Sequence, residues 1–203
     1  MKVFRFEGKP GNNYFEVLWY IVNSGQVYED ERGMKYIEAE PITIEVVKPV
    51  WDVPERVLPE YIVQRYGSMF IIDYADRLVG GKAELGDYVY SYGERLHRAG
   101  QLHKAIEKLK EHRWTRRATI TIRVPEDIEL DDAPCMTVVD FKIRQDGLRL
   151  TALFRSHDME NGWPINYYGL LVLGQYVAEQ VGVTLARITT ISLSAHVYLW
   201  RGR

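Results

Sequence analysis

The chain has 203 residues, of which 46% are apolar and 27% are charged, with a formal net charge of −2. This length and composition support one hydrophobic core, and no boundary rich in Gly, Ser or Pro divides the chain, so we predict a single domain over residues 1–203. The charge excludes a generally basic nucleic-acid surface, no window is apolar enough for a membrane span or signal peptide, and the single cysteine excludes an internal disulfide and favours a cytoplasmic location.

The first third of the chain predicts a helix, a charged loop, a strand and a second helix. Apolar residues recur at helical spacing over residues 12–24, and Gly25 would end that helix. The run at 29–33 is charged and turn-forming, which is typical of a solvated loop. Alternation predicts a strand over 42–46, and a later helix opened by a proline carries Glu60 in its first turn, where an acidic side chain is favourable with the helix dipole.

The middle of the chain predicts a tyrosine-rich segment, a helix and a strand. Tyrosines crowd residues 87–92, which by pattern alone is typical of an aromatic strand. A helix from about 101 to 112 has one apolar face, and it looks structural. Arg116 and Arg117 then precede a strand over 118–124, and by residue type they indicate a charged loop.

Alternating residues on both sides of Asp146-Gly147 predict a pair of strands joined by a tight turn. If residues 145 and 148 face each other, Cys135 falls opposite Asp158 and within reach of Arg155 and Ser156. A guanidinium beside a thiol favours the thiolate, which is the nucleophilic form. The alternative is a small buried cysteine in a core strand, since free cysteine is among the most buried residue types.

The last quarter predicts a helix and a final strand. Trp163-Pro164 begins a helix that runs to about residue 180, with Asn166 in its first turn. Alternation over 191–199 places His196 and Tyr198 side by side on the polar face of one strand. The other histidines show no metal-ligand spacing, so we predict no metal: they are His97, His103, His112 and His157.

Four of these motifs, in this order, resemble the active-site series of the thymidylate synthases and their nucleotide-hydroxymethylase relatives. They are Pro134-Cys135, Arg155-Ser156-His157-Asp158, Gly162-Trp163-Pro164-Ile165-Asn166 and His196-Val197-Tyr198. The likeness extends upstream through Tyr92-Gly93-Glu94-Arg95 and Arg116-Arg117, and more faintly to Asp30-Glu31-Arg32-Gly33. The chain resembles the short, archaeal-type branch most.

The resemblance implies an α+β domain with a large mixed sheet, helices on one face, and a sheet-to-sheet homodimer interface with shared active sites on the other. It also implies conversion of dUMP to dTMP with 5,10-methylenetetrahydrofolate as co-substrate. Cys135 would add to C6 of the pyrimidine, Tyr92 and Glu60 would manage the proton at C5, and Asp158 would belong to the catalytic set.

The resemblance also assigns substrate-binding residues. Arg32, Arg155 and Ser156 would hold the phosphate together with the pair Arg116 and Arg117, which in relatives reaches across the dimer. Asn166 would match N3–H and O4 of uracil, because an amide offers both a donor and an acceptor. His196 and Tyr198 would bind the 3′-hydroxyl of the sugar.

Two departures from the family pattern leave alternatives open. Met136 stands where many relatives have histidine, and Phe154 stands where glutamine is common. The alternatives are a nucleotide 5-hydroxymethylase, in which water replaces the hydride, and a nucleotide-binding dimer without catalysis; a cysteine hydrolase has no supporting motif. Only residues 199–203 follow Tyr198, whereas longer members carry a segment that folds over the folate, so we expect weak folate binding and a share of hydroxymethylated product.

Overall fold

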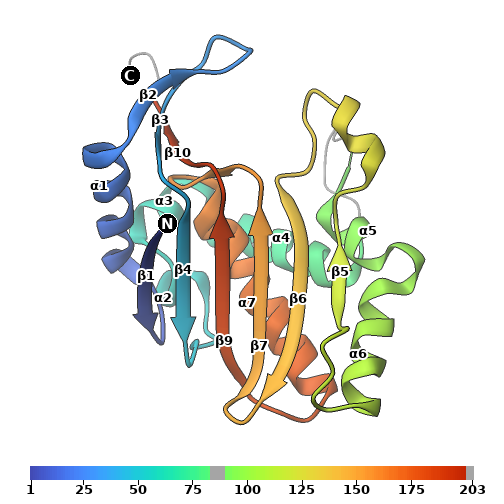
Figure 1. The fold of residues 1–203 in the computed structure, drawn as a ribbon. Helices are drawn as coiled ribbons and strands as arrows, with labels where there is room; N and C mark the ends of the chain where they lie inside the picture. Colours follow the sequence, from blue (N-terminus) through green and yellow to red (C-terminus); the bar gives the residue numbers. More distant parts are fainter. Residues whose placement is uncertain (83–89, 200–203) are drawn as a thin grey trace.

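The computed structural model describes residues 1–82 and 90–199, and its centre is a six-stranded sheet (Figure 1). The strands lie in the order β1-β4-β9-β7-β6-β5. The pairs β1/β4 and β7/β9 are parallel and the other pairs are antiparallel, so the sheet is mixed, as predicted. The bounds are Lys2–Glu7 for β1, Ile42–Val47 for β4, Leu185–Ser192 for β9, Gly147–Phe154 for β7, Met136–Arg144 for β6 and Thr119–Thr121 for β5.

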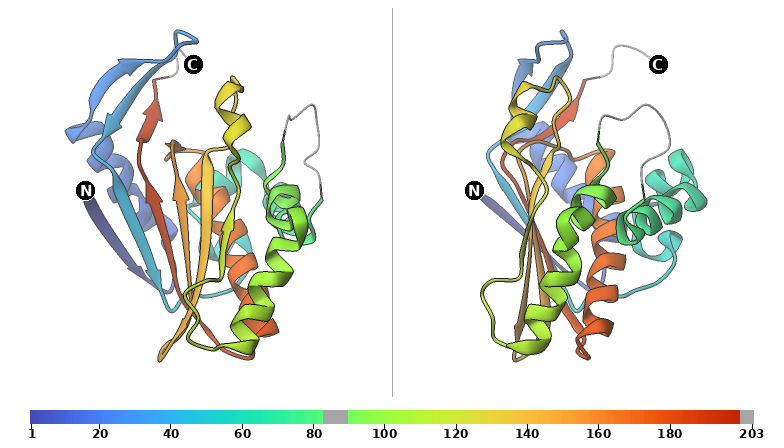
Figure 2. Two further views of the ribbon diagram at one scale, coloured as in Figure 1. Left: turned by 45° about the vertical axis from the view of Figure 1, so that its right-hand side comes forward. Right: turned by 90° about the vertical axis from the view of Figure 1, so that its right-hand side faces the viewer.

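Helices cover one face of this sheet, which the edge-on view of Figure 2 shows. Helix α7 (Gly162–Gln180) lies across the centre of the sheet and is buried on nearly all sides. Helix α4 (Ser68–Gly80) lies on its outer side. The two helices approach closely at Gly169, where an added Cβ would lie 2.9 Å from the ring of Tyr74. This contact fixes the place of the Tyr74 ring.

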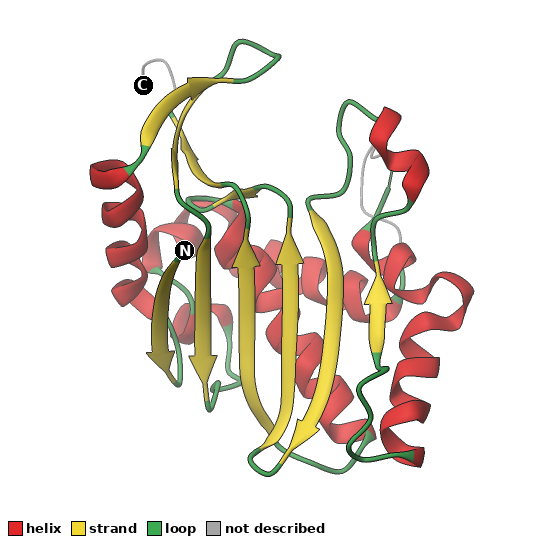
Figure 3. Cartoon of the chain, viewed as in Figure 1, coloured by secondary structure: helices red, strands yellow, loops and turns green. Residues whose placement is uncertain are grey.

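The remaining helices surround this core (Figure 3). They are α1 (Phe15–Ser24), α2 (Pro54–Val57), α3 (Glu60–Tyr66), α5 (Tyr92–His97) and α6 (Gln101–Glu111), with 3₁₀ turns at Gly11–Tyr14, Arg98–Gly100 and Pro125–Glu129. The predicted helices are therefore confirmed, and α6 ends one residue before the predicted end. Within the described ranges, no helix is long and apolar enough to cross a membrane.

The opposite face of the sheet carries none of the described helices. Three apolar side chains lie in one row across it, because Val138 pairs with Leu153 and Leu153 pairs with Ile191. Nearby, Arg187 and Glu45 form an ion pair at 3.0 Å with about a quarter of each side chain exposed. This half-buried, partly apolar face is the part of the fold that the sequence predicted as a dimer interface.

A second, four-stranded sheet stands at one end of the first. Its order is β2-β3-β10-β8, and its bounds are Gln26–Glu29 for β2, Lys35–Ala39 for β3, Ala195–Tyr198 for β10 and His157–Asp158 for β8. The charged run at 29–33 is the connection between β2 and β3. The small sheet therefore brings segments from the two ends of the chain to the end of β6 and β7 that contains Cys135.

The prediction of one continuous strand over 191–199 was wrong. The chain leaves the large sheet after Ser192, and Leu193 donates its amide to the carbonyl of Phe154 where the strand bends. The buried face of β9 is also polar at its end, because Thr190 and Ser192 are each only 1% exposed and accept hydrogen bonds from α7 and β8. Alternation of apolar and polar residues along the sequence cannot reveal such a bend.

The hairpin of β6 and β7 was predicted correctly, but its register was wrong. Arg144 pairs with Gly147, so Gln145 and Asp146 form the turn, and Gly147 follows it with φ of +128°. The pairing is displaced by two residues relative to the prediction, and a bulge follows Met136. Cys135 therefore meets Arg155, whose amide donates to the Cys135 carbonyl at 2.8 Å, and it does not face Asp158.

Candidate active site

Two adjoining pockets, one of which is lined by Cys135, form the candidate site. The first, which we call the arginine pocket, is lined by Asp30, Glu31, Arg32, Tyr36, Asp131, Asp132, Cys135, Arg155, Ser156, Ser194, His196 and Tyr198. The second, the tyrosine pocket, is lined by Tyr66, Phe70, Asp73, Tyr74, Arg77, Tyr90, Tyr92, Asp132, Gly162, Ile165 and Asn166. Asp132 lines both pockets. Their volumes, about 260 and 290 Å³, are below those of typical drug-sized ligand sites, so a nucleotide together with a second substrate would need both.

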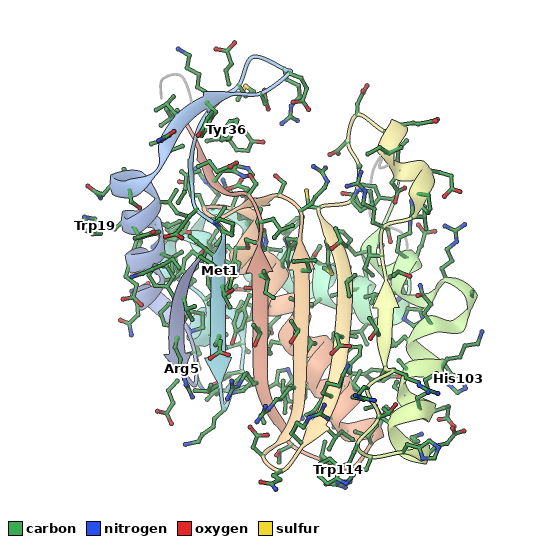
Figure 4. The ribbon with its side chains drawn as sticks, viewed as in Figure 1. Met1, Arg5, Trp19, Tyr36, His103 and Trp114 are labelled. Carbon is green, nitrogen blue, oxygen red and sulfur yellow. The ribbon has the colours of Figure 1, made fainter. Side chains whose placement is uncertain are left out.

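A more open hollow of about 710 Å³ lies at the opposite end of the large sheet. Its lining includes Arg5, Lys48 and Arg187 but no residue of the predicted site. Figure 4 labels Arg5 at that end and Tyr36 at the end with the arginine pocket. We therefore place the candidate site at the two smaller pockets, where the thiol and the motif residues lie.

The Cys135 thiol is half-buried, and its pKa is raised above the ordinary value. Burial is the largest cause, the Arg155 guanidinium opposes it, and the Asp132 carboxylate adds to it. The predicted assistance of Arg155 therefore exists, but burial outweighs it and the unliganded protein holds a thiol. Arg155 itself donates to the carbonyls of Pro134 at 3.2 Å and Ala133 at 2.6 Å, which fixes its guanidinium against the segment before the cysteine.

The small sheet supplies Arg32 to the arginine pocket. Its guanidinium donates to Tyr198 Oη at 3.0 Å and to the Asp30 carboxylate at 2.9 and 3.2 Å. The Arg32 side chain is 65% exposed, so it can reach an anion in the pocket. The sequence linked Arg32 and Tyr198 only through the resemblance, and the pairing of β2, β3 and β10 brings them into contact.

Aromatic rings line the same pocket around His196. The rings of His196 and Tyr198 lie 5.0 Å apart and nearly perpendicular, so the predicted neighbours are neighbours. Tyr36 contacts both rings edge-on, at 5.5 and 6.3 Å. His196 is 5% exposed, and burial lowers its pKa. Sequence reasoning missed Tyr36, because its place in the site depends on the pairing of β3 with β10.

Tyr92 lines the tyrosine pocket and contacts the segment that carries Cys135. Its hydroxyl oxygen accepts the amide of Met136, the residue after the cysteine, at 3.2 Å. Burial raises its pKa well above the ordinary value. Tyr90 lies beside it with ring centroids 5.6 Å apart, and burial raises the pKa of Tyr90 to about 12. Tyr90 is a pocket residue that the motif comparison did not single out, although the alternation with Tyr92 was visible.

Asn166 projects from the start of α7 into the tyrosine pocket. Its Oδ1 accepts the Tyr74 hydroxyl at 2.5 Å, and its Nδ2 donates to His157 Nε2 at 3.1 Å. Neither Tyr74 nor His157 was predicted as a site residue. The sequence separation of 92 between Tyr74 and Asn166 explains why no local pattern revealed the contact.

Asp158 and Ser156 follow Arg155 in the predicted motif. Asp158 Oδ1 accepts the amides of Glu160 at 2.9 Å and Asn161 at 3.0 Å, and its Oδ2 accepts the Asn161 side chain. This geometry makes Asp158 the organiser of the turn that leads into α7. Ser156 lines the arginine pocket beside Arg155.

Four predicted residues line neither pocket, and they are Asp158, Glu60, Arg116 and Arg117. Glu60 is exposed at the start of α3, and its carboxylate accepts the amide of Gln64 at 2.8 Å. Arg116 and Arg117 line a hollow with Trp114, which Figure 4 labels at the opposite end of the large sheet. The carboxylates that do line the tyrosine pocket are Asp73 and Asp132. One chain alone therefore does not assemble the whole predicted set.

The described part of the chain contains no cluster of three or more His, Cys, Asp and Glu side chains that could hold a metal ion. The arginine pocket offers two arginines and several hydroxyls, which suit a phosphate and a sugar, beside four acidic side chains. The tyrosine pocket offers aromatic rings and an amide, which suit a flat heterocycle.

The thymidylate synthase family model matches residues 16–201 of the chain. A protein of Methanosarcina mazei named "Putative thymidylate synthase" is 40% identical over 187 residues, covering 90% of this chain and 82% of its own length. A protein of the same name from Methanothermobacter marburgensis is 36% identical over 206 residues, covering 91% and 88%. The crystal structure of thymidylate synthase from T4 phage matches with a TM-score of 0.70 and 17% identity, covering 92% of this chain and 76% of that one.

Proposed function

The chain belongs to the thymidylate synthase family, and we propose that it converts dUMP to dTMP with 5,10-methylenetetrahydrofolate through a covalent bond between Cys135 and the pyrimidine. The observation that carries this proposal is the position of the thiol. Cys135 lines the arginine pocket, which shares Asp132 with the tyrosine pocket, so a nucleotide with its phosphate near the arginines can hold its ring beside the sulfur.

The arginine pocket supports the binding half of the proposal. Arg32, Arg155 and Ser156 would hold the phosphate, and His196 and Tyr198 would bind the 3′-hydroxyl of the sugar. Arg32 is mostly exposed, so it can exchange its bond to Asp30 for one to the phosphate. A phosphate adds negative charge near the four acidic residues of the pocket, which are Asp30, Glu31, Asp131 and Asp132, and the arginines must outweigh them.

The chemistry begins with loss of the Cys135 proton, because burial keeps the sulfur protonated in the unliganded protein. The thiolate then adds to C6, and C5 becomes nucleophilic and bonds to the one-carbon unit of the folate. The proton at C5 leaves with help from the Tyr92 hydroxyl. Elimination of tetrahydrofolate leaves an exocyclic methylene, and hydride transfer from the folate followed by expulsion of Cys135 from C6 gives dTMP and dihydrofolate.

Glu60 was predicted to share the C5 proton transfer, and its exposed position limits that role. Its carboxylate would reach the tyrosine pocket only if α3 shifted, since it lines neither pocket. Asp158 would act by holding the turn before Asn166 in place.

We propose that a homodimer completes the site. Two copies could pack through the sheet faces that carry no helices, related by a twofold axis parallel to the sheets and perpendicular to the strands. Each end of one sheet would then lie against the opposite end of the other sheet. Arg116 and Arg117 of one copy would then lie near the partner's arginine pocket. The row of Val138, Leu153 and Ile191 supports this face as the interface, because it would otherwise leave apolar side chains in water.

The decisive experiment is an assay of products from dUMP and methylenetetrahydrofolate, with the nucleotides separated by chromatography. We expect dTMP together with dihydrofolate as the main products, with a smaller share of 5-hydroxymethyl-dUMP. 5-Hydroxymethyl-dUMP with tetrahydrofolate as the main products would favour the hydroxymethylase, and binding of dUMP without any product would favour a nucleotide-binding dimer. The proposal includes a cytoplasmic location, because one cysteine in 203 residues is typical of a reducing compartment.

A further inference from the structure

The side-chain amide of Asn166 is the middle of a hydrogen-bonded chain of four residues. Tyr74 bonds its Oδ1, His157 Nε2 bonds its Nδ2, and His157 Nδ1 bonds Ser192 Oγ at 2.9 Å. We propose that Tyr74 and His157 hold the Asn166 amide in one orientation, which makes the site accept a uracil ring and reject a cytosine ring. This inference rests on the proposed function, in which Asn166 faces the pyrimidine.

The two contact lengths indicate which end of the amide is oxygen. The Tyr74 contact is 2.5 Å, which suits O–H···O, whereas N–H···O contacts are ordinarily about 2.9 Å or longer. The contact to His157 is 3.1 Å, which suits an N–H donor to a ring nitrogen. A phenol is also a better donor than acceptor, and a carbonyl is the better acceptor. The oxygen of Asn166 therefore lies on the Tyr74 side.

His157 is a neutral and immobile acceptor. Its side chain is 2% exposed, and burial lowers its pKa to about 3, so one ring nitrogen carries a hydrogen and the other carries a lone pair at neutral pH. With Nδ1–H directed to Ser192, Nε2 presents its lone pair to Asn166. The ring stacks on Phe154 with centroids 3.8 Å apart, which opposes rotation.

The hydrogen-bonding groups of the Asn166 amide that Tyr74 and His157 do not use select the base. One lone pair of Oδ1 and one N–H of Nδ2 stay available to a ligand. Uracil presents N3–H and O4 in adjacent positions. Its N3–H can donate to Oδ1, and its O4 can accept from Nδ2–H. Cytosine presents an acceptor at N3 and a donor at N4. In the same pose the acceptor N3 would face the acceptor Oδ1, and the N4 amino group would face the N–H of Nδ2. Reading cytosine would require the amide to flip, and its oxygen would then face the lone pair of His157.

The experiment compares the dissociation constants of dUMP and dCMP by calorimetry. The test variant is Tyr74→Phe, which removes the hydroxyl and keeps the ring beside Gly169. The matched control is Tyr167→Phe, because the Tyr167 hydroxyl is buried on the same helix as Asn166 and has no hydrogen-bond partner within the described ranges. His157→Phe is a second test variant, and thermal unfolding of every variant checks that it folds.

We expect the wild-type protein to prefer dUMP, and Tyr74→Phe to reduce the ratio of the two constants by about tenfold, chiefly through tighter dCMP binding. Tyr167→Phe should leave the ratio unchanged. In an Asn166→Asp background, Tyr74→Phe should not change the ratio, since a carboxylate has no orientation to fix. A purely structural role of Tyr74 would not depend on residue 166 in this way.

An unchanged ratio in both Tyr74→Phe and His157→Phe, with dUMP still bound, would overturn the inference and leave the proposed function intact. An equal change in Tyr167→Phe would also overturn it. Failure of the wild-type protein to bind either nucleotide would overturn the proposed function, and the inference with it.

Discussion

The amide of Arg155 donates to the carbonyl of Cys135 at 2.8 Å, one step beyond the last paired residues of β6 and β7. The backbone therefore fixes the guanidinium and the thiol on adjacent strands. The side chain of Arg155 then returns to the carbonyls of Ala133 and Pro134, so the arginine holds both sides of the segment that carries the nucleophile.

The thiol of Cys135 should react slowly with iodoacetamide at neutral pH in the unliganded protein. Because burial raises its pKa, the rate should rise with pH and reach its midpoint above 9.0. Asp132→Asn should lower that midpoint, since the Asp132 charge raises the pKa, and Arg155→Gln should raise it. A midpoint near neutrality would show that the guanidinium dominates after all.

Cys135→Ser should bind dUMP almost as well as the wild-type protein but form no dTMP. An alcohol at neutral pH is a far weaker nucleophile than a thiolate, and the substitution changes little of the pocket shape. Calorimetry measures the binding, and chromatography of nucleotides measures the turnover. Substantial residual turnover would rule out the covalent mechanism.

Asn166→Asp should weaken dUMP binding and improve dCMP binding. The carboxylate removes the N–H that meets O4 of uracil and offers an acceptor to the amino group of cytosine. We expect a change of at least about tenfold in the ratio of dissociation constants in competition binding. If the ratio stays constant, another residue reads the base.

Mixing an Arg116→Ala/Arg117→Ala variant with Cys135→Ser tests the shared site. Each homodimer should be poorly active, and random exchange should restore about a quarter of wild-type activity, because half of the dimers are mixed and each has one complete site. A mixture of Cys135→Ser with Tyr92→Phe is the control. Both of those residues come from one chain, so no recovery is expected there.

If the arginine variant recovers no activity with Cys135→Ser after proven subunit exchange, the pair acts within its own chain or has no role. Size-exclusion chromatography with light scattering should first show that both variants are dimers.

Stability should fall as the pH drops below 6.5, and His157 should account for part of that loss. The unfolded chain takes up a proton on His157 near pH 6.5, whereas the folded protein does so only near pH 3, so acid favours unfolding. Between pH 6.5 and 4 the effect on the free energy of unfolding is about 3 kcal/mol. Urea titrations of wild-type protein and His157→Phe should show a shallower pH dependence for the variant. The exposed His103 serves as control, and His103→Ala should keep the wild-type slope.

The hairpin of β6 and β7 shows what an alternating sequence can and cannot predict. Alternation predicted both strands and which side chains face the core, and a displacement of two residues leaves that alternation unchanged. The register was therefore decided by the turn, where Gly147 follows the two turn residues and is not one of them. The alternating pattern could not distinguish a turn at residues 145 and 146 from a turn at residues 146 and 147.

The site shows a similar limit. The motif residues Cys135, Arg155 and Asn166 lie at the pockets as the resemblance implied, because each follows a predictable strand or helix end. Tyr36 and Tyr74 were missed, since their contacts join segments more than ninety residues apart. Glu60 begins the predicted helix, yet its carboxylate lines neither pocket, because the place of that helix depends on tertiary packing.

The small sheet makes the arginine pocket the last part of the molecule to form during synthesis. Tyr36 and Tyr198 lie on paired strands, and Arg32 is bonded to a hydroxyl that is translated 166 residues later. A ribosome-bound chain that stops before β10 can fold its first helix and the hairpin of β2 and β3, but His196 and Tyr198 of the arginine pocket are still missing. A prematurely terminated chain would therefore lack the two aromatic rings that we propose to bind the sugar, and Arg32 would lack its bond to Tyr198.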